Sequence, residues 1–104
     1  MNKKIILSSK QFKIVKDILQ SNLPVAANVW VFGSRAKGNV KPYSDLDLAI
    51  DMHQPITIDI HAKLADAFDE SDLPFKVDIV DWQSINESFK KNIADDRIEF
   101  AEKN

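Results

Sequence analysis

The chain has 104 residues; cysteine is absent from it and glycine occurs only twice. Without cysteine, the protein can form neither a disulfide scaffold nor a thiolate zinc site. Its longest apolar run is far shorter than the roughly 20 residues that a bilayer-spanning helix needs. Its first residues also lack the roughly 7–15 apolar residues of a secretory signal. We therefore expect a cytoplasmic protein that does not enter the membrane.

An excess of positive charge is missing as well. The 14 Lys and Arg residues against 16 Asp and Glu give a formal net charge of −2. A duplex-binding protein needs Lys and Arg clustered on one face, so we expect no direct contact with nucleic acid. The length suits one domain, placed over residues 1–104 with a core at about 9–94 and a tail at about 95–104. A homo-oligomer stays open, because small domains often bury apolar surface by self-association.

Apolar periodicity and turn residues predict the secondary structure. Helices are expected at residues 8–23, 55–71 and 84–94. Two of them open with the spacing of a capping box, at Ser8 with Gln11 and at Ser84 with Glu87. Strands are expected at residues 28–32, 45–50 and 75–80, while Ile98 and Phe100 fit either a short edge strand or a tail. This order predicts an α/β fold, a small mixed sheet with helices packed mainly on one face.

Three carboxylates fall within the predicted strands, where Asp is disfavoured. Asp45 and Asp47 are two residues apart and point to the same face, and Asp78 lies in the third strand. If the strands are neighbours, the carboxylates converge and repel one another unless a divalent cation neutralises them. Oxygen ligands without His or Cys suit Mg²⁺, or else Mn²⁺. A calcium loop starting at Asp45 does not fit, because Ala49 and Ile50 occupy the positions of an oxygen ligand and a glycine.

The segment between the first two predicted strands suits a phosphate group. Gly33 and Ser34 stand at the start of a short helix, where backbone N–H groups and the helix dipole attract anions. The Ser34 hydroxyl adds a donor, and Arg35 and Lys37 bring positive charge, although both could be ordinary solvated charges. A phosphate site beside metal-binding carboxylates implies two-metal phosphoryl or nucleotidyl transfer.

Together these motifs resemble a known family. Gly33-Ser34, ten residues and then Asp45-x-Asp47 are similar to the signature of the polymerase-β-like nucleotidyltransferase superfamily. Residues 32–38 and 44–49 resemble its smallest members, the minimal nucleotidyltransferases (MNT), and the resemblance covers roughly residues 29–82 and the first helix. The resemblance implies the nucleotidyltransferase fold.

The resemblance also implies a role for each matching residue. Gly33 and Ser34 would hold the triphosphate, with Arg35 and Lys37 as further nucleotide-binding candidates. Asp45 and Asp47 would ligate Mg²⁺. Asp78 would complete the catalytic metal site and help to deprotonate the acceptor. Lys37 stands where many relatives have Arg, so it keeps the charge without the bidentate fork.

The family implies ATP as the donor and a tyrosine of a partner HEPN toxin as the acceptor, so that the chain acts as an antitoxin. Two other functions stay open. The protein could bind nucleotide without catalysis and neutralise its partner by occlusion, or it could be a small-molecule (antibiotic) nucleotidyltransferase. All three share the same predicted nucleotide site.

Other polar and aromatic residues near the motifs have ordinary structural interpretations. Asp51 continues the face of Asp47 near the end of its strand and is expected to be solvated. Asp81 is expected to be a turn or cap residue. Trp30 and Trp82 are expected to contribute to packing rather than to a partner surface.

Overall fold

The computed structural model describes residues 4–24, 26–38 and 40–100 of the chain. Its elements in chain order are α1 (Ser9–Asn22), β1 (Asn28–Phe32), α2 (Ser34–Lys37), β2 (Leu46–Asp51), α3 (Ile58–Asp69), β3 (Val77–Asp81), α4 (Glu87–Asp96) and β4 (Ile98–Glu99). The strands form a mixed sheet in the order β3-β2-β1-β4. Strand β1 is antiparallel to β2 and β4, and β2 is parallel to β3. The predicted mixed α/β sheet is confirmed. No helix in the described ranges is long and apolar enough to cross a membrane.

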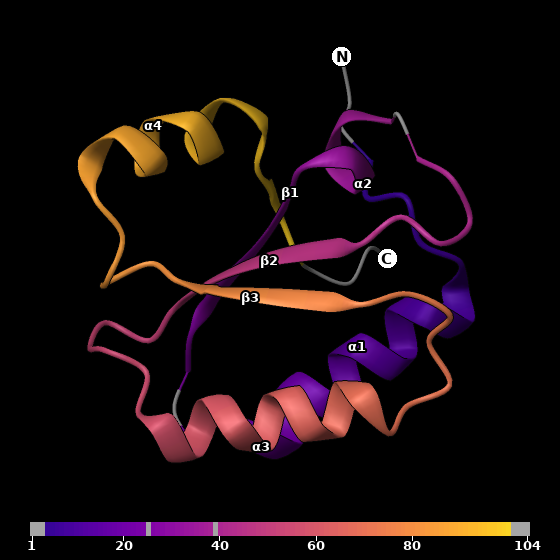
Figure 1. Ribbon diagram of the computed structural model, residues 1–104, viewed down its shortest axis with the longest axis horizontal. Helices are drawn as coiled ribbons and strands as arrows, with labels where there is room; N and C mark the ends of the chain where they lie inside the picture. Colours follow the sequence, from indigo (N-terminus) through magenta and orange to yellow (C-terminus); the bar gives the residue numbers. More distant parts are fainter. Residues whose placement is uncertain (1–3, 25, 39, 101–104) are drawn as a thin grey trace.

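Helices α1 and α3 lie against one face of the sheet and form the main core with it (Figure 1). The alternation of β2 explains this, because Leu46, Leu48 and Ile50 point to these helices and are fully buried. The buried apolar side chains of this layer come from both helices, β1, β2 and the segments that follow β2 and precede β3: Val15, Leu19, Val29, Val31, Leu46, Leu48, Ile50, Met52, Leu64, Phe68 and Phe75.

Helix α4 lies on the opposite side of the sheet from α1 and α3 (Figure 1). Its Phe89 meets Phe32 of β1 edge to face at 6.3 Å between ring centroids. Farther along, the rings of Trp30 and Trp82 lie 5.1 Å apart, and the guanidinium of Arg97 covers both. The prediction that helices pack mainly on one face therefore holds for α1 and α3, and aromatic and cation–π contacts hold α4 on the other face.

The start of α1 agrees with the sequence prediction and the start of α3 does not. Ser8 and Gln11 form the expected capping box, each side chain accepting the other residue's backbone N–H. The helix expected to open at Pro55 begins instead after Thr57, whose hydroxyl accepts the N–H of Ile60 at 3.2 Å. Because Thr satisfies an otherwise unpaired N–H of the first turn, it is the better cap, and the proline lies in the preceding loop.

A different cap also displaces the predicted start of α4. The Ser84 hydroxyl donates to the carboxylate of Asp81 at 2.7 Å, and Asn86 caps the helix by accepting the N–H of Phe89 at 2.8 Å. The helix then continues to Asp96, beyond the predicted end at residue 94. Asp81 is thus the turn residue that the sequence predicts, and the predicted capping box of Ser84 is wrong.

The end of the described chain forms the short edge strand that the sequence left open. Ile98 pairs with Val31, and the N–H of Phe100 donates to the carbonyl of Val29 at 2.8 Å. The Phe100 ring stacks on Phe12 of α1 at 4.4 Å. Residues 95–96 of the predicted tail therefore belong to α4 and residues 98–99 join the sheet, while residues 101–104 lie outside the described residues.

Strands β2 and β3 start slightly later than predicted. The N–H of Leu46 donates to the carbonyl of Lys76 at 2.9 Å, which marks where the parallel pair begins. Asp45 therefore lies in the loop just before β2. Phe75, expected to open the third strand, is a buried core residue ahead of β3.

We expect Leu48→Ala to lower the free energy of unfolding by about 2–5 kcal/mol, because it leaves a cavity in a fully buried layer. Ile58 on α3 is 87% exposed, and Ile58→Ala should change the same quantity by less than about 0.5 kcal/mol. Urea denaturation followed by circular dichroism compares the two variants. Equal losses would contradict the core described here.

Candidate active site

The sheet brings Asp47 and Asp78 together. Asp47 of β2 is the direct register partner of Asp78 on the parallel strand β3, and of Phe32 on the other side. Paired residues on neighbouring strands project to the same face, and the next residues along β2, Leu46 and Leu48, are buried in the opposite layer. The two carboxylates therefore lie side by side on the face that does not pack on α1 and α3, as the sequence predicts.

The charges of all three carboxylates meet at Asp47. Its pKa is raised from 3.8 to about 6, chiefly by burial and further by the negative charges of Asp78 and Asp45. Asp45 and Asp78 are exposed, whereas Asp47 is partly buried. The protein thus keeps a carboxylate in a place where its ionised form is disfavoured, which is typical of a functional site.

The turn at Gly33 and Ser34, which the sequence predicts to bind phosphate, lies directly against the Asp47 carboxylate. Gly33 follows β1 with φ 74° and ψ −152°, a conformation that side chains rarely adopt. A Cβ added to Gly33 would overlap the Oδ2 atom of Asp47. The Gly33 carbonyl accepts the N–H groups of Ala36 and Lys37 at 3.1 and 3.0 Å, which starts α2. Glycine is needed at this position so that the turn and the carboxylate can lie in contact.

The residues present fit a divalent cation by their chemistry. The donor set is oxygen only, as Mg²⁺ and Mn²⁺ prefer, and the raised pKa of Asp47 shows that Asp78 and Asp45 act on the same place. Within the ranges that the structure describes, no three His, Cys, Asp or Glu side chains are gathered closely enough to hold a metal ion. The indication of a site comes from the strand register of Asp47 and Asp78 and from the raised pKa of Asp47.

Two further predicted nucleotide residues lie on α2 with different surroundings. Ser34 opens the helix directly after Gly33 and precedes Ala36 and Lys37, whose N–H groups donate to the Gly33 carbonyl. Lys37 ends it, and its ammonium group pairs with the carboxylate of Asp96 on α4 at 3.3 Å. Because both groups of this ion pair are substantially exposed, the lysine stays accessible to an anion.

Arg35 is not brought to the carboxylates. Its side chain is buried, and its guanidinium donates to the carbonyls of Ile6, Pro42 and Ser44. Burial lowers the pKa of the guanidinium. Sequence reasoning missed this role, because nothing in the spacing distinguishes an inward-pointing arginine from one that faces a phosphate.

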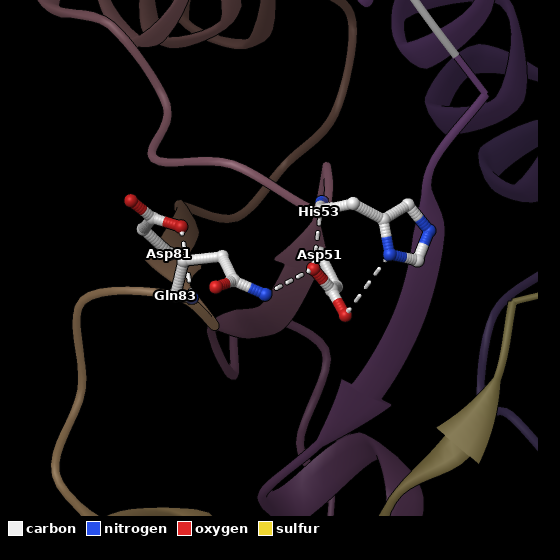
Figure 2. Close-up of polar contacts among 4 residues, drawn as sticks. All are labelled: Asp51, His53, Asp81 and Gln83. Atoms are coloured by element: carbon white, nitrogen blue, oxygen red, sulfur yellow. Dashed lines mark hydrogen bonds and ion pairs between the residues drawn. The ribbon is translucent and has the colours of Figure 1, made fainter.

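At the far end of β2, Asp51 is buried rather than solvated, so that expectation is wrong. Figure 2 shows its carboxylate accepting the Gln83 side chain at 2.9 Å and the N–H of His53 at 2.8 Å. Burial alone would raise the pKa of Asp51, but these bonds and the charges of His53 and Lys90 lower it. Asp81 lies beside it and accepts the N–H of Gln83. This network joins the ends of β2 and β3, away from the Asp47–Asp78 pair.

We expect Gly33→Ala to destabilise the fold more than Gly38→Ala does. Both glycines have positive φ, 74° and 91°, which costs an L residue about 1–2 kcal/mol. Only the Cβ at Gly33 meets the Asp47 carboxylate, since nothing lies within 4 Å of one built at Gly38. Urea denaturation measures both, and an equal loss would contradict the close contact between the turn and Asp47.

We expect Asp47→Asn to stabilise the metal-free protein above about pH 6. Because the folded state raises the pKa of Asp47 above 3.8, its contribution to stability is present at low pH and is lost as pH rises through about 6. After allowance for solvent screening, the gain in unfolding free energy at pH 8 is on the order of 1–2 kcal/mol and should vanish below pH 4. Asp66→Asn, on the exposed side of α3, is the matched control. A stability gain that did not depend on pH would refute this assignment.

A known protein family matches the part of the chain that forms this site. A family model described as polymerase beta, nucleotidyltransferase, matches residues 13–104. The probable protein adenylyltransferase MntA of Haemophilus influenzae is 47% identical over 87 residues, which make up 84% of this chain and 75% of the relative.

Solved structures show the same fold. A toxin–antitoxin crystallised with AMP-PNP matches with a TM-score of 0.74 and 22% identity over 88% of this chain and 73% of the other. The complex of a tri-AMPylated Shewanella oneidensis HEPN toxin with an MNT antitoxin matches with a TM-score of 0.66 and 20% identity, over 88% and 70%. These likenesses confirm the predicted fold. Since the family model spans Gly33, Ser34 and all three carboxylates, the chain belongs to the polymerase beta nucleotidyltransferase family and is a nucleotidyltransferase, as its sequence predicts.

Proposed function

We propose that this chain is a Mg²⁺-dependent protein adenylyltransferase that transfers AMP from ATP to a tyrosine hydroxyl of a HEPN-type toxin, and that it acts as a cytoplasmic antitoxin. The observation that carries the proposal is the contact of the Gly33 turn with Asp47, itself paired in register with Asp78. This contact puts a phosphate-binding turn and two carboxylates at one place on the sheet.

The nucleotide would bind through α2 and the turn before it. With no Cβ at Gly33, the Asp47 carboxylate fits against the turn, so a phosphate bound at the turn would lie beside that carboxylate. The N–H groups at the start of α2, beginning at Ser34, would donate to the phosphate, and the Ser34 hydroxyl would add a donor. Lys37 would exchange its exposed partner Asp96 for a phosphate oxygen. Such an exposed ion pair contributes little stability, so this exchange is inexpensive.

Asp45, Asp47 and Asp78 would hold the divalent cation. When bound, Mg²⁺ neutralises phosphate charge and lowers the pKa of a nearby hydroxyl. The chain's own contribution is to keep Asp47 beside two other carboxylates despite the cost of its ionisation. Because that cost is built into the fold, the protonated form of Asp47 is favoured below about pH 6, and cation binding should weaken there.

The reaction is a displacement at the α-phosphate. The acceptor oxygen forms a bond to phosphorus, the bond from phosphorus to the bridging oxygen breaks, and pyrophosphate leaves. The hydroxyl proton goes to a carboxylate, and exposed Asp78 at the edge of the sheet is placed to receive it. Holding both reactants in line on a rigid strand pair supplies the orientation that such a transfer needs.

The protein acceptor is supported by the relatives. The 47% identical protein of Haemophilus influenzae is named a probable protein adenylyltransferase. Structures with the same fold include a toxin–antitoxin with AMP-PNP and an AMPylated HEPN toxin bound to its MNT antitoxin. We infer the same donor and the same class of partner for this chain.

The test is transfer of α-labelled AMP from ATP with Mg²⁺, using a HEPN-type protein of the same organism as acceptor. We expect label on the acceptor with wild type and at least about a hundredfold less with Asp47→Asn, because a metal ligand is lost. Asp66→Asn is the matched control and should keep full transfer. Label on the acceptor should disappear when its tyrosines are replaced by phenylalanine.

Three results separate the proposal from its rivals. A stable complex that neutralises the toxin without any transfer would overturn the enzymatic proposal in favour of occlusion. Transfer from another nucleoside triphosphate would overturn ATP as the donor. Efficient modification of an aminoglycoside, with no transfer to protein, would make the chain a small-molecule nucleotidyltransferase.

A further inference from the structure

The buried arginine of α2 connects three separate segments. The Arg35 side chain is only 4% exposed. Its Nε donates to the Ser44 carbonyl at 3.0 Å, its Nη1 to Ile6 at 2.9 Å and its Nη2 to Pro42 at 3.2 Å. The guanidinium also lies over the Phe75 ring at 4.0 Å from its centre. A planar fork of several donors is the group best suited to such a set of contacts.

Two of these segments lead directly to carboxylates. Ser44, whose carbonyl Arg35 holds, directly precedes Asp45. Phe75, on which the guanidinium stacks, lies just ahead of β3, the strand that carries Asp78. Arg35 itself is in α2, immediately after the Gly33–Ser34 turn. The Arg35 side chain therefore links α2 to the segments that precede Asp45 and the strand of Asp78.

Within the described residues, the hydrogen bonds that residues 40–44 make without Arg35 are local. The Lys41 N–H donates to the Ser44 hydroxyl at 2.9 Å, and the Ser44 N–H donates to the Lys41 carbonyl at 3.0 Å. These bonds close the loop on itself but do not attach it to the rest of the molecule. The carbonyls of Pro42 and Ser44 are attached through Arg35. Asp45 lies outside β2, so the ladder does not place it.

We propose that Arg35 is a positioning residue: by holding the Pro42 and Ser44 carbonyls against α2 and the Phe75 ring, it fixes Asp45 relative to Asp47 and Asp78 and so sets the affinity of the three carboxylates for a divalent cation. The inference rests on the proposed function, because that proposal makes Asp45 a ligand. It assigns Arg35 no contact with nucleotide, in contrast to what the sequence suggests.

The first measurement is Mn²⁺ binding to the full chain, followed by electron paramagnetic resonance of the free ion. We expect Arg35→Lys and Arg35→Met to weaken binding by about 10- to 100-fold, as loss of a group that orients metal ligands does. Lysine keeps the charge but cannot hold three carbonyls at once, so Arg35→Lys should bind Mn²⁺ little better than Arg35→Met. If Arg35→Met does not fold, Arg35→Lys alone tests the proposal.

Arg97 provides the matched control. Its guanidinium also covers aromatic rings, at 4.4 Å from Trp30 and 5.0 Å from Trp82, and within the described residues no hydrogen bond or ring contact joins its side chain to residues 40–44. Arg97→Lys should therefore lower stability by a comparable cation–π loss and leave Mn²⁺ affinity within about twofold of wild type. The urea midpoint of each variant shows whether its loss of Mn²⁺ affinity can be explained by a loss of stability.

Two further readouts separate positioning from folding. In Arg35→Ala, guanidinium ion at millimolar concentration should fill the vacated space and restore Mn²⁺ affinity, whereas methylammonium should not. Hydrogen exchange should rise at residues 41–45 in the Arg35 variants and not in Arg97→Lys. A purely structural arginine would give neither selective rescue nor exchange confined to this loop.

The outcomes are distinct for the two proposals. If wild type binds Mn²⁺ and Arg35→Lys binds it equally well, the positioning role is overturned while the proposed function stands. If wild type shows no Mn²⁺ binding, with or without ATP, the proposed function fails first and the inference with it. If affinity falls in Arg35→Lys and in Arg97→Lys alike, the effect is general destabilisation and the inference fails.

Discussion

The close approach of the Gly33 backbone to the Asp47 carboxylate is the constraint on which the site depends. It requires a positive φ at the end of β1, the antiparallel pairing of Phe32 with Asp47, and a helix that turns away immediately after the glycine. A one-residue shift of register between β1 and β2 would replace Asp47 by Leu46 or Leu48. The strand register therefore determines which side chains face the Gly33 turn.

The two faces of the sheet divide stability and chemistry between them. On one face, Leu46, Leu48 and Ile50 are fully buried under α1 and α3. On the other face, Asp47 carries a raised pKa because burial and two like charges oppose its ionisation. A domain of this size has a modest free energy of unfolding, so the cost of ionising Asp47 is a considerable fraction of it. The buried apolar side chains that alternate with Asp47 along β2 offset this cost.

Features that depend on period and spacing could be predicted from the sequence, and features that depend on distant partners could not. Strand β1, the capping box of α1 and the shared face of Asp47 and Asp78 follow from alternation and local signals. The anchoring of Arg35 requires carbonyls up to 29 residues away, and the burial of Asp51 requires Gln83, 32 residues away. No single-residue pattern reports such tertiary hydrogen bonds, and rival caps such as Ser84 and Asn86 look alike without them.

The aromatic cluster beneath α4 gives the molecule an optical property. The chain has two tryptophans, and both rings lie in one pair, covered by Arg97 and approached by Lys90. The core between α1, α3 and the sheet contains neither of them. Intrinsic tryptophan fluorescence therefore reports how α4 packs on the face of the sheet that carries Asp47 and Asp78. Its emission should change when the packing on that face changes, even if the core on the opposite face does not.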